Sequence, residues 1–600
     1  MTQRLLSGNE AIARGAYEAG VQVATGYPGT PSSEILEVIA AQYGREIYAE
    51  WSANEKVAMD AAAGAAYSGR RTLVTTKQVG MNVLADALLY TVYTGAEAGL
   101  VVVTADDPGM FSSQNEQDNR WYARLGKIPL LEPADSQEAK DFVIAAFELA
   151  EQFDTPVLIR TTMRVSHSKS VVIEGARASV PEKVGPFVRN QTKYVCTAMW
   201  AKKRHPIVEQ RLIDLADYAD RASFNRVEPG DRALGIITSG VTYTYVKEVF
   251  PDASVLKLGM TFPLPKQIIR AFVHSVDQVL VVEELDPFLE EQVRAMGIPV
   301  IGKDLFPACD ELLPDTLARL ASEAGLIDAP ASSPPNVEAL PDLPPRTPVL
   351  CAGCPHRSTY YWLAKMKVPV AGDIGCYNLG CLPPFNAQHT MGCMGASIGV
   401  LHGMAIAGMP ERAVATIGDS TFFHSGMPAL ANMVHNRGRG VSIIMDNGTT
   451  AMTGHQDHPG TSWSLHDSDA PHIAIEPLVR ALGVKKVRSV NAFTMQEVKD
   501  GLDDCLAYDG PSVLLVQGLC VQISKPDAPS HLVDSAACIA CGTCFRLGCP
   551  AIVKSSDVVE KTGRAKAEID PIQCVGCDMC RQVCPASAIC DPRQSQAGAR

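Results

Sequence analysis

A run of closely spaced cysteines near the carboxyl end constrains the fold of this chain more than any other feature. Eight of its 18 cysteines fall within 47 residues, in the order Cys538-x2-Cys541-x2-Cys544-x4-Cys549-Pro550 and Cys574-x2-Cys577-x2-Cys580-x3-Cys584-Pro585. In a reducing compartment, regular C-x-x-C spacing indicates metal ligation before disulfide bonding. We therefore predict a small C-terminal domain built around metal centres.

The type of metal centre follows from the position of the fourth cysteine in each run. The second run matches the bacterial ferredoxin pattern, and the first has one extra residue before its fourth cysteine. In such modules the fourth cysteine of each run ligates the other cluster. The predicted [4Fe–4S] ligand sets are Cys538, Cys541, Cys544 and Cys584, and Cys549, Cys574, Cys577 and Cys580. Paired zinc sites are the alternative, because C-x2-C pairs also bind zinc.

Length and charge exclude several classes of protein. Six hundred residues exceed one hydrophobic core, so several domains are expected. The formal net charge of −13 argues against binding to nucleic acids or to anionic membranes. We find no signal-peptide pattern and no run of about 18 apolar residues. The sequence predicts a cytoplasmic protein without a membrane span.

Short β-rich runs alternate with alanine-rich helical stretches along most of the chain, which predicts a multidomain α/β fold with doubly wound parallel sheets. Residues 181–329 are interpreted as a polar connector followed by a middle α/β domain. Seven prolines between Pro330 and Pro348 predict an interdomain linker at residues 330–348. The expected domains are therefore residues 1–180, 181–329, 349–527 and 528–600.

Two neighbouring strands of the third domain each end in polar residues. The expected strand Val414–Ile417 is followed by Gly418-Asp419-Ser420, and the strand Val441–Met445 is followed by Asp446-Asn447-Gly448-Thr449. This spacing places oxygen ligands at the carboxyl ends of adjacent parallel strands, where they can hold Mg²⁺ against a diphosphate. Ordinary loop residues are the alternative reading.

A small-residue segment upstream, Met391–Gly399, predicts a helix start that allows close approach to phosphates. Together these motifs resemble the diphosphate-binding domain of thiamine diphosphate enzymes. The resemblance implies that Gly418, Asp419, Ser420, Asn447 and Thr449 bind the cofactor. It also implies that the side chains of Asp419 and Asn447 and the carbonyl of Thr449 ligate Mg²⁺.

Thiamine enzymes also need a carboxylate that touches the aminopyrimidine of the cofactor. The segment Asn54–Tyr67 resembles the helix of the pyrimidine-binding domain that begins with this glutamate. The resemblance assigns the catalytic role to Glu55. The alternative is an exposed acidic residue that is favoured by the helix dipole.

Iron–sulfur clusters and thiamine diphosphate in one chain narrow the field to 2-oxoacid:ferredoxin oxidoreductases. The segment Tyr27–Glu34 resembles the substrate loop of that superfamily, in which Thr30 contacts the 2-oxoacid. The domain order resembles the large subunits of indolepyruvate:ferredoxin oxidoreductases, with residues 1–180 as pyrimidine domain and 349–527 as diphosphate domain. That family implies coenzyme A-dependent oxidative decarboxylation, ferredoxin as acceptor, a small partner subunit carrying a missing domain, and a dimer of heterodimers.

A third cluster is suggested by four further cysteines. Some superfamily members bind a cluster beside the cofactor, and the order of Cys351, Cys354, Cys376 and Cys520 resembles their ligand pattern. Buried unliganded thiols are the alternative. Nearby histidines, among them His458, match no metal spacing and are interpreted as loop residues that form hydrogen bonds rather than as a base.

Two rival functions stay open at this stage. One is a non-oxidative thiamine diphosphate decarboxylase or acyl transferase with structural clusters, and the other is an electron-transfer subunit without catalysis of its own. The combination of Glu55, Asp419 and Asn447 argues against the second, and two adjacent clusters argue against the first.

Overall fold

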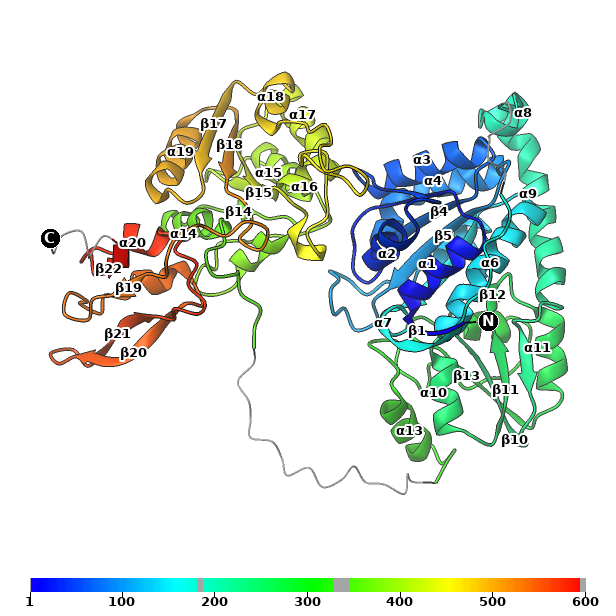
Figure 1. Cartoon of the computed structure of the whole chain (residues 1–600). Coiled ribbons are helices and arrows are strands. Elements are labelled where there is room, and N and C mark those ends of the chain that lie inside the picture. Colours follow the sequence, from blue (N-terminus) through cyan, green and yellow to red (C-terminus); the bar gives the residue numbers. More distant parts are fainter. Residues whose placement is uncertain (1, 181–186, 329–345, 594–600) are drawn as a thin grey trace. The chain divides into compact units, whose positions relative to one another are not determined.

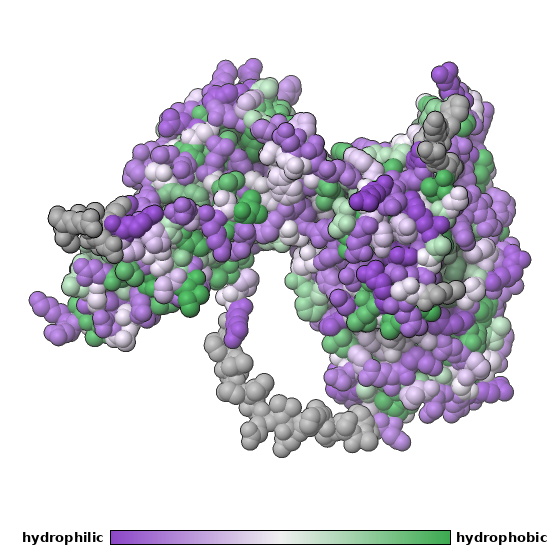
Figure 2. Space-filling model, in the orientation of Figure 1, coloured by the Kyte–Doolittle hydropathy of each residue, from purple (hydrophilic) through white to green (hydrophobic). Residues whose placement is uncertain are grey.

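The computed structural model of the chain describes residues 2–180, 187–328 and 346–593. They belong to two compact units, Met1–Leu340 and Pro341–Arg600 (Figure 1). Most of the predicted linker at residues 330–348 lies outside the described residues. Hydrophilic residues cover most of the visible face of each unit (Figure 2). Among the helices in the described ranges, none is both long enough and apolar enough to span a bilayer.

The N-terminal unit is built on a seven-stranded sheet. Its order is β12 (Met260–Phe262), β6 (Leu130–Leu131), β7 (Val157–Thr162), β5 (Leu100–Asp106), β4 (Thr72–Lys77), β2 (Val23–Gly26) and β3 (Tyr48–Trp51). All neighbours are parallel except β12, which pairs with β6 in the antiparallel direction. The parallel βαβ pattern predicted from the sequence is confirmed.

Helix α1 (Gly8–Glu18) precedes the strands of this sheet in the chain, and the other helices alternate with them. These other helices are α2 (Ser33–Tyr43), α3 (Glu55–Tyr67), α4 (Gly80–Thr94), α5 (Arg120–Gly126), α6 (Ser136–Phe153) and α7 (Met163–His167). The strand β1 (Gln3–Ser7) pairs with β8 (Lys169–Ile173) in a separate antiparallel pair. The alanine-rich face of α3 packs Ala62 and Ala66 into the core, because small side chains allow a helix to lie close to the sheet.

The connector region contains α8 (Gln191–Tyr194) and the 22-residue α9 (Ala198–Ala219). A four-stranded sheet follows, with the order β13 (Gln278–Val282), β10 (Asp231–Ser239), β11 (Ala253–Leu258) and β9 (Arg226–Glu228). Its helices are α10 (Thr242–Val249), α11 (Lys266–Val273), α12 (Phe288–Arg294) and α13 (Pro314–Glu323).

The C-terminal unit contains a five-stranded parallel sheet. Its order is β14 (Val370–Ala371), β15 (Val414–Gly418), β16 (Gly440–Asp446), β18 (Pro511–Gln517) and β17 (Lys486–Asn491). Its main helices are α14 (His356–Met366), α15 (Ala396–Ile406), α17 (Met427–His435), α18 (Ile475–Ala481) and α19 (Met495–Ala507). Successive residues of β15 enter different cores, Val414 on one face and Ala415 on the other, so both faces of the sheet are covered.

The cysteine-rich tail has little regular structure. It contains two short antiparallel pairs, β19 (Leu532–Val533) with β22 (Ile589–Cys590) and β20 (Ile552–Val559) with β21 (Arg564–Ile569). A 3-10 turn at Cys544–Leu547 and the short α20 (Met579–Gln582) complete it. Six of the eight tail cysteines contribute to or pack against its small core, whose other buried members are aliphatic residues.

A buried charge network joins the two sheets of the N-terminal unit. Arg120, at the start of α5, donates to both carboxylate oxygens of Asp118 and, over 2.6 Å, to Glu283 at the end of β13. It also donates to the carbonyls of Glu284 and Asp286. The Arg120, Asp118 and Glu283 side chains are each only 1% exposed, so each charge depends on the others.

Replacing Arg120 by Ala is expected to loosen the junction between the two sheets. The change leaves buried carboxylates without their partner, which costs about 3–5 kcal/mol. Amide hydrogen exchange in peptides covering α5 and β13 should accelerate roughly 100-fold or more. The control is Arg319→Ala, because Arg319 forms an exposed pair with Glu323 that contributes little. Equal exchange in the two variants would contradict a structural role for the network.

Candidate active site

Glu55 is buried at the beginning of α3, although it is a charged residue. The side chain of Asn54 caps this helix by accepting a 2.9 Å hydrogen bond from the amide of Val57. The start of α4 lies against the carboxylate, since a Cβ atom added to Gly80 would stand 2.5 Å from Oε1 of Glu55. The starts of two helices therefore meet at this carboxylate.

Thr30 lies in the loop that connects β2 to α2, and neighbouring loops hold its backbone in place. The amide of Asn9 donates to the carbonyl of Pro31 over 2.7 Å, and the hydroxyl of Ser112 donates to the carbonyl of Thr30 over 3.3 Å. Ser112 belongs to the loop after β5. Because β2, β4 and β5 are adjacent and parallel, the loops that follow them share one edge of the sheet.

Asp419 follows β15 directly and is buried within the C-terminal unit. Its carboxylate accepts hydrogen bonds from the backbone amides of Ser420 and Gly448, both at 2.8 Å, and Nε2 of His458 lies 3.3 Å away. Burial alone would raise the pKa of this carboxyl group. The charge of His458 and the hydrogen bonds outweigh burial and lower the pKa, so Asp419 is ionised at neutral pH.

The side-chain amide of Asn447 lies close to the carbonyl of Thr449 and to the carboxylate of Asp419. The positions of these atoms show whether the site can hold a cation. In one orientation of its amide, Asn447 donates to the Thr449 carbonyl over 2.8 Å and to both Asp419 oxygens over 3.2 Å. In the opposite orientation the amide oxygen faces only other oxygens, and a divalent cation between them would favour that orientation. The three predicted ligands therefore form an oxygen donor set of the type that Mg²⁺ prefers.

The residues around this oxygen set are closely packed. A Cβ atom on Gly418 would stand 2.8 Å from the ring of Tyr377, and the hydroxyl of Thr450 donates to that of Ser420 over 2.8 Å. The predicted helix start upstream is confirmed, because α15 begins at Ala396. However, Asp373 accepts hydrogen bonds from the amides of Gly395 and Ser397, so two of the N–H groups expected to face phosphates already have a carboxylate partner.

The eight tail cysteines lie in two neighbourhoods. The thiol of Cys544 interacts electrostatically with those of Cys541 and Cys584. The thiols of Cys577 and Cys580 interact with those of Cys549 and Cys574. Burial raises the pKa of Cys544 and Cys577 to about 11, so their thiolate forms are disfavoured at neutral pH unless a positive charge stabilises them. Among the residues that the structure describes, no group of three or more His, Cys, Asp or Glu side chains is arranged to hold a metal ion.

The four cysteines of the predicted third cluster also lie together. Cys376 interacts electrostatically with Cys351, Cys354 and Cys520. The backbone amide of Cys520 donates to the carbonyl of Asn447 over 3.0 Å, which ties this group to the oxygen set. Cys381 and Cys393 do not belong to the predicted ligand set, and both are exposed.

Arg357 joins the third cysteine group to the tail, a role that no sequence motif predicts. Its guanidinium is almost fully buried and donates to the carbonyls of Leu350 and Cys351 and, over 2.7 Å, to that of Leu547. Beside it, a Cβ atom on Gly353 would stand 2.3 Å from the side chain of Val575. The loops that carry Cys351 and Cys577 are therefore in direct contact.

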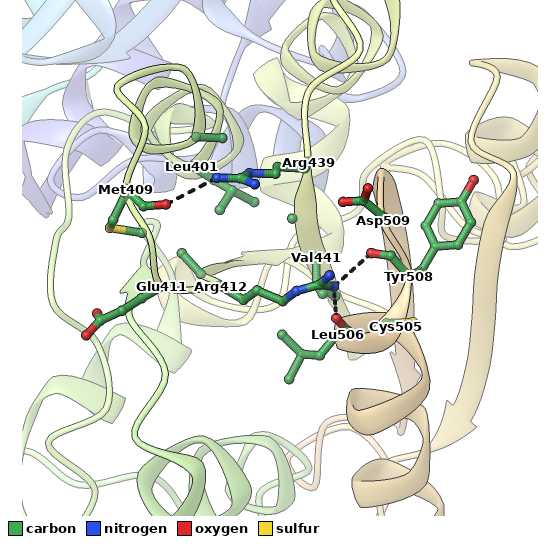
Figure 3. A pocket seen from close by; sticks show the side chains of 13 residues that line it. Leu401, Met409, Glu411, Arg412, Arg439, Val441, Cys505, Leu506, Tyr508 and Asp509 are labelled. Atoms are coloured by element: carbon green, nitrogen blue, oxygen red, sulfur yellow. Dashed lines mark hydrogen bonds between the residues drawn. The ribbon is translucent and has the colours of Figure 1, made fainter.

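A pocket in the same domain lies at the other end of the sheet (Figure 3). Arg412 crosses it and donates to the carbonyls of Leu506 and Tyr508. Ala413 and Gly440, at the amino ends of β15 and β16, line this pocket, whereas Asp419 and Asn447 follow the carboxyl ends. The pocket is therefore separate from the oxygen set.

Three family models match separate parts of the chain. Residues 14–212 match the family model described as pyruvate flavodoxin/ferredoxin oxidoreductase, thiamine diphosphate-binding. Residues 373–516 match the C-terminal binding domain of thiamine pyrophosphate enzymes, and residues 537–588 match the 4Fe-4S dicluster domain. These matches confirm thiamine diphosphate-binding domains and a C-terminal iron–sulfur domain.

Individual proteins resemble the chain over nearly its whole length. Indolepyruvate oxidoreductase subunit IorA of Methanothermobacter thermautotrophicus is 42% identical, with 97% of this chain and 96% of that protein covered. IorA of Pyrococcus horikoshii is 38% identical, with 99% and 97% covered. The solved 2-oxoglutarate:ferredoxin oxidoreductase of Magnetococcus marinus aligns with a TM-score of 0.46 at 17% identity, over 54% of this chain and 65% of that chain. Because the identity to IorA extends over the complete domain order, the chain belongs to the IorA family of the 2-oxoacid:ferredoxin oxidoreductase superfamily.

Proposed function

We propose that this large subunit of a 2-oxoacid:ferredoxin oxidoreductase acts on arylpyruvates, with indolepyruvate as the preferred substrate. The products would be the acyl-coenzyme A, CO₂ and reduced ferredoxin. One observation carries the proposal. A single chain combines a buried glutamate at a helix start, an oxygen donor set for Mg²⁺ and two groups of tail cysteines. The relatives that share this order bear the name indolepyruvate oxidoreductase.

Residues of the two large domains would have different roles in the reaction. Thiamine diphosphate, when bound, supplies the carbon nucleophile and accepts the electron pair that the departing CO₂ leaves behind. Asp419, Asn447 and the Thr449 carbonyl would hold Mg²⁺ against the diphosphate. Glu55 would hold a proton at the aminopyrimidine, and Thr30 would contact the 2-oxoacid. The ionised state of Asp419 supports its role as a metal ligand.

The cysteines would carry the electrons away. Cys538, Cys541, Cys544 and Cys584 would bind one [4Fe–4S] cluster, and Cys549, Cys574, Cys577 and Cys580 a second. Cys351, Cys354, Cys376 and Cys520 would bind a third beside the oxygen set. The contact between the Cys351 and Cys577 loops, braced by Arg357, supports a route from the third cluster to the second.

The partners follow from the family. We propose that a small subunit carries the missing domain, that the assembly is a dimer of heterodimers, and that ferredoxin accepts the electrons. Reduction of ferredoxin or viologen under argon with a panel of 2-oxoacids tests the proposal. Aldehyde release without reduction would favour a non-oxidative decarboxylase, and an inert chain would favour an electron-transfer subunit.

Asp419→Asn and Asp419→Ala are expected to weaken Mg²⁺-dependent binding of thiamine diphosphate by roughly 100-fold or more. The reason is that loss of an outer-shell partner alone commonly costs a metal site 10–100-fold in affinity. Iron content should stay normal. Cofactor content and equilibrium binding are measured beside Asp500→Ala, a change on the exposed side of α19. Unchanged cofactor content in both Asp419 variants would refute the assignment.

Glu55→Gln should retain the cofactor but lose turnover by about 10²–10⁴-fold, because it can no longer take part in proton transfer. Hydrogen–deuterium exchange at the thiazolium C2 position reports this step directly by NMR. Glu248→Gln, an exposed glutamate of α10, is the matched control. Wild-type exchange in Glu55→Gln would mean that another group performs the proton transfer.

Anaerobically purified protein should contain about 12 iron atoms per chain if all three cysteine sets are loaded, at four irons per cluster. Cys354→Ser is expected to lose about four of them while the tail clusters remain. Cys505→Ser is the control, because Cys505 is also buried but belongs to none of the sets. If the Cys354→Ser protein keeps the iron content of the control, the third cluster does not exist.

A further inference from the structure

Lys77 is a partly buried lysine for which the mechanism above has no role. It ends β4, at the sheet edge that also carries the Thr30 loop. Its aliphatic stem lies against Gly29, because a Cβ atom added there would stand 3.1 Å from Cβ, Cγ and Cδ of Lys77. The stem is therefore fixed beside the residue that precedes Thr30.

The ammonium group of Lys77 forms one hydrogen bond within the described part of the chain. Its Nζ donates to the carbonyl of Ser112 over 2.9 Å, and the hydroxyl of Ser112 donates in turn to the carbonyl of Thr30. Among the described residues no carboxylate forms an ion pair with Lys77 within 4.0 Å. Two of the three N–H donors of the ammonium group thus remain available to a ligand.

Charged groups surround this lysine at longer range. Burial lowers the pKa of Lys77, while the charges of Asp107 and Glu55 act in the opposite direction. Oδ2 of Asp107 accepts hydrogen bonds from the backbone amide of Ser112 and the hydroxyl of Ser113, whereas Oδ1 is buried and has no hydrogen-bond partner among the described residues. Asp107 and Glu55 therefore act on Lys77 through their charges, and neither forms an ion pair with it within 4.0 Å in the described residues.

Other cations near this edge of the sheet already have carboxylate partners. Arg160 donates to Asp106 over 2.8 Å and to Glu132 over 2.9 Å. His167 lies 3.5 Å from Glu34. Moving a charge out of water costs free energy unless an opposite charge is nearby. A partly buried lysine without an ion pair, such as Lys77, is therefore suited to an anionic ligand.

We infer that the ammonium group of Lys77 binds the carboxylate of the 2-oxoacid substrate, next to Thr30. The inference rests on the proposed function and deepens it. A 2-oxoacid presents a carboxylate directly beside its oxo group, and an ammonium with two available N–H groups can donate hydrogen bonds to both carboxylate oxygens. Lys77 would thus orient the carboxyl group that is lost as CO₂, whereas Glu55 handles a proton of the cofactor.

The test replaces Lys77 by Met, which keeps the length of the side chain but removes its charge. In the assembled enzyme, the KM for an arylpyruvate in viologen reduction should rise about 100-fold, in line with loss of a charge-assisted contact. Lys77→Arg should retain most of the wild-type affinity because it keeps the positive charge. Lys56→Met is the matched control, since Lys56 is an exposed residue of α3 paired with Asp60.

A second measurement separates recognition of the carboxylate from a structural role. The methyl ester of the same arylpyruvate has no negative charge, so its inhibition constant should be equal in wild type and Lys77→Met. A structural role would weaken acid and ester alike and would overturn the inference, as would an unchanged KM in Lys77→Met. If the wild type reduces no acceptor with any 2-oxoacid, the proposed function fails and the inference fails with it.

Discussion

Parallel strand pairing is the constraint on which both candidate sites depend. In a parallel sheet every strand ends at the same edge, so residues that follow different strands become neighbours. The register of β15 and β16 aligns Gly418 with Met445, and the loops carrying Asp419 and Asn447 therefore begin side by side. The same rule applies in the N-terminal unit, where β2, β4 and β5 lead into the loops of Thr30, Lys77 and Ser112.

Burial of polar groups at these edges is possible because each group has a specific partner. Backbone amides satisfy Asp419 and Asp373, so these carboxylates remain inside without a neighbouring arginine. Arg120 instead neutralises two buried carboxylates at once and holds the sheets of the N-terminal unit together. Arg357 uses backbone carbonyls in the same way, and it thereby fixes the distance between the Cys351 loop and the tail. Fixed loops are what an electron path between clusters requires.

Sequence patterns could predict the features that have local signals. Strands β15 and β16 could be predicted because their apolar runs end in polar turn residues. The start of α3 could be predicted from Asn54 and the alanines that follow it. The pairing of β12 with β6 could not be predicted, because three residues at a sheet edge carry no periodicity. The roles of Lys77 and Asp373 depend on partners far along the chain. No spacing rule connects Lys77 to Ser112, or Asp373 to the start of α15.

The candidate sites of the two units differ in electrostatic character, because one presents electron-rich donors suited to cations and the other presents a positive charge suited to an anion. In the C-terminal unit, the oxygens of Asp419, Asn447 and Thr449 and the grouped thiols are electron-rich donors, with His458 beside Asp419 and Arg357 acting on Cys354. Oxygen donors of this kind suit Mg²⁺, and grouped thiols suit iron. The edge around Thr30 in the N-terminal unit instead presents an ammonium group whose stem and carbonyl contact are already fixed. A donor that is held in place before the ligand arrives pays less ordering entropy on binding, so the fold itself contributes to the affinity for an anion.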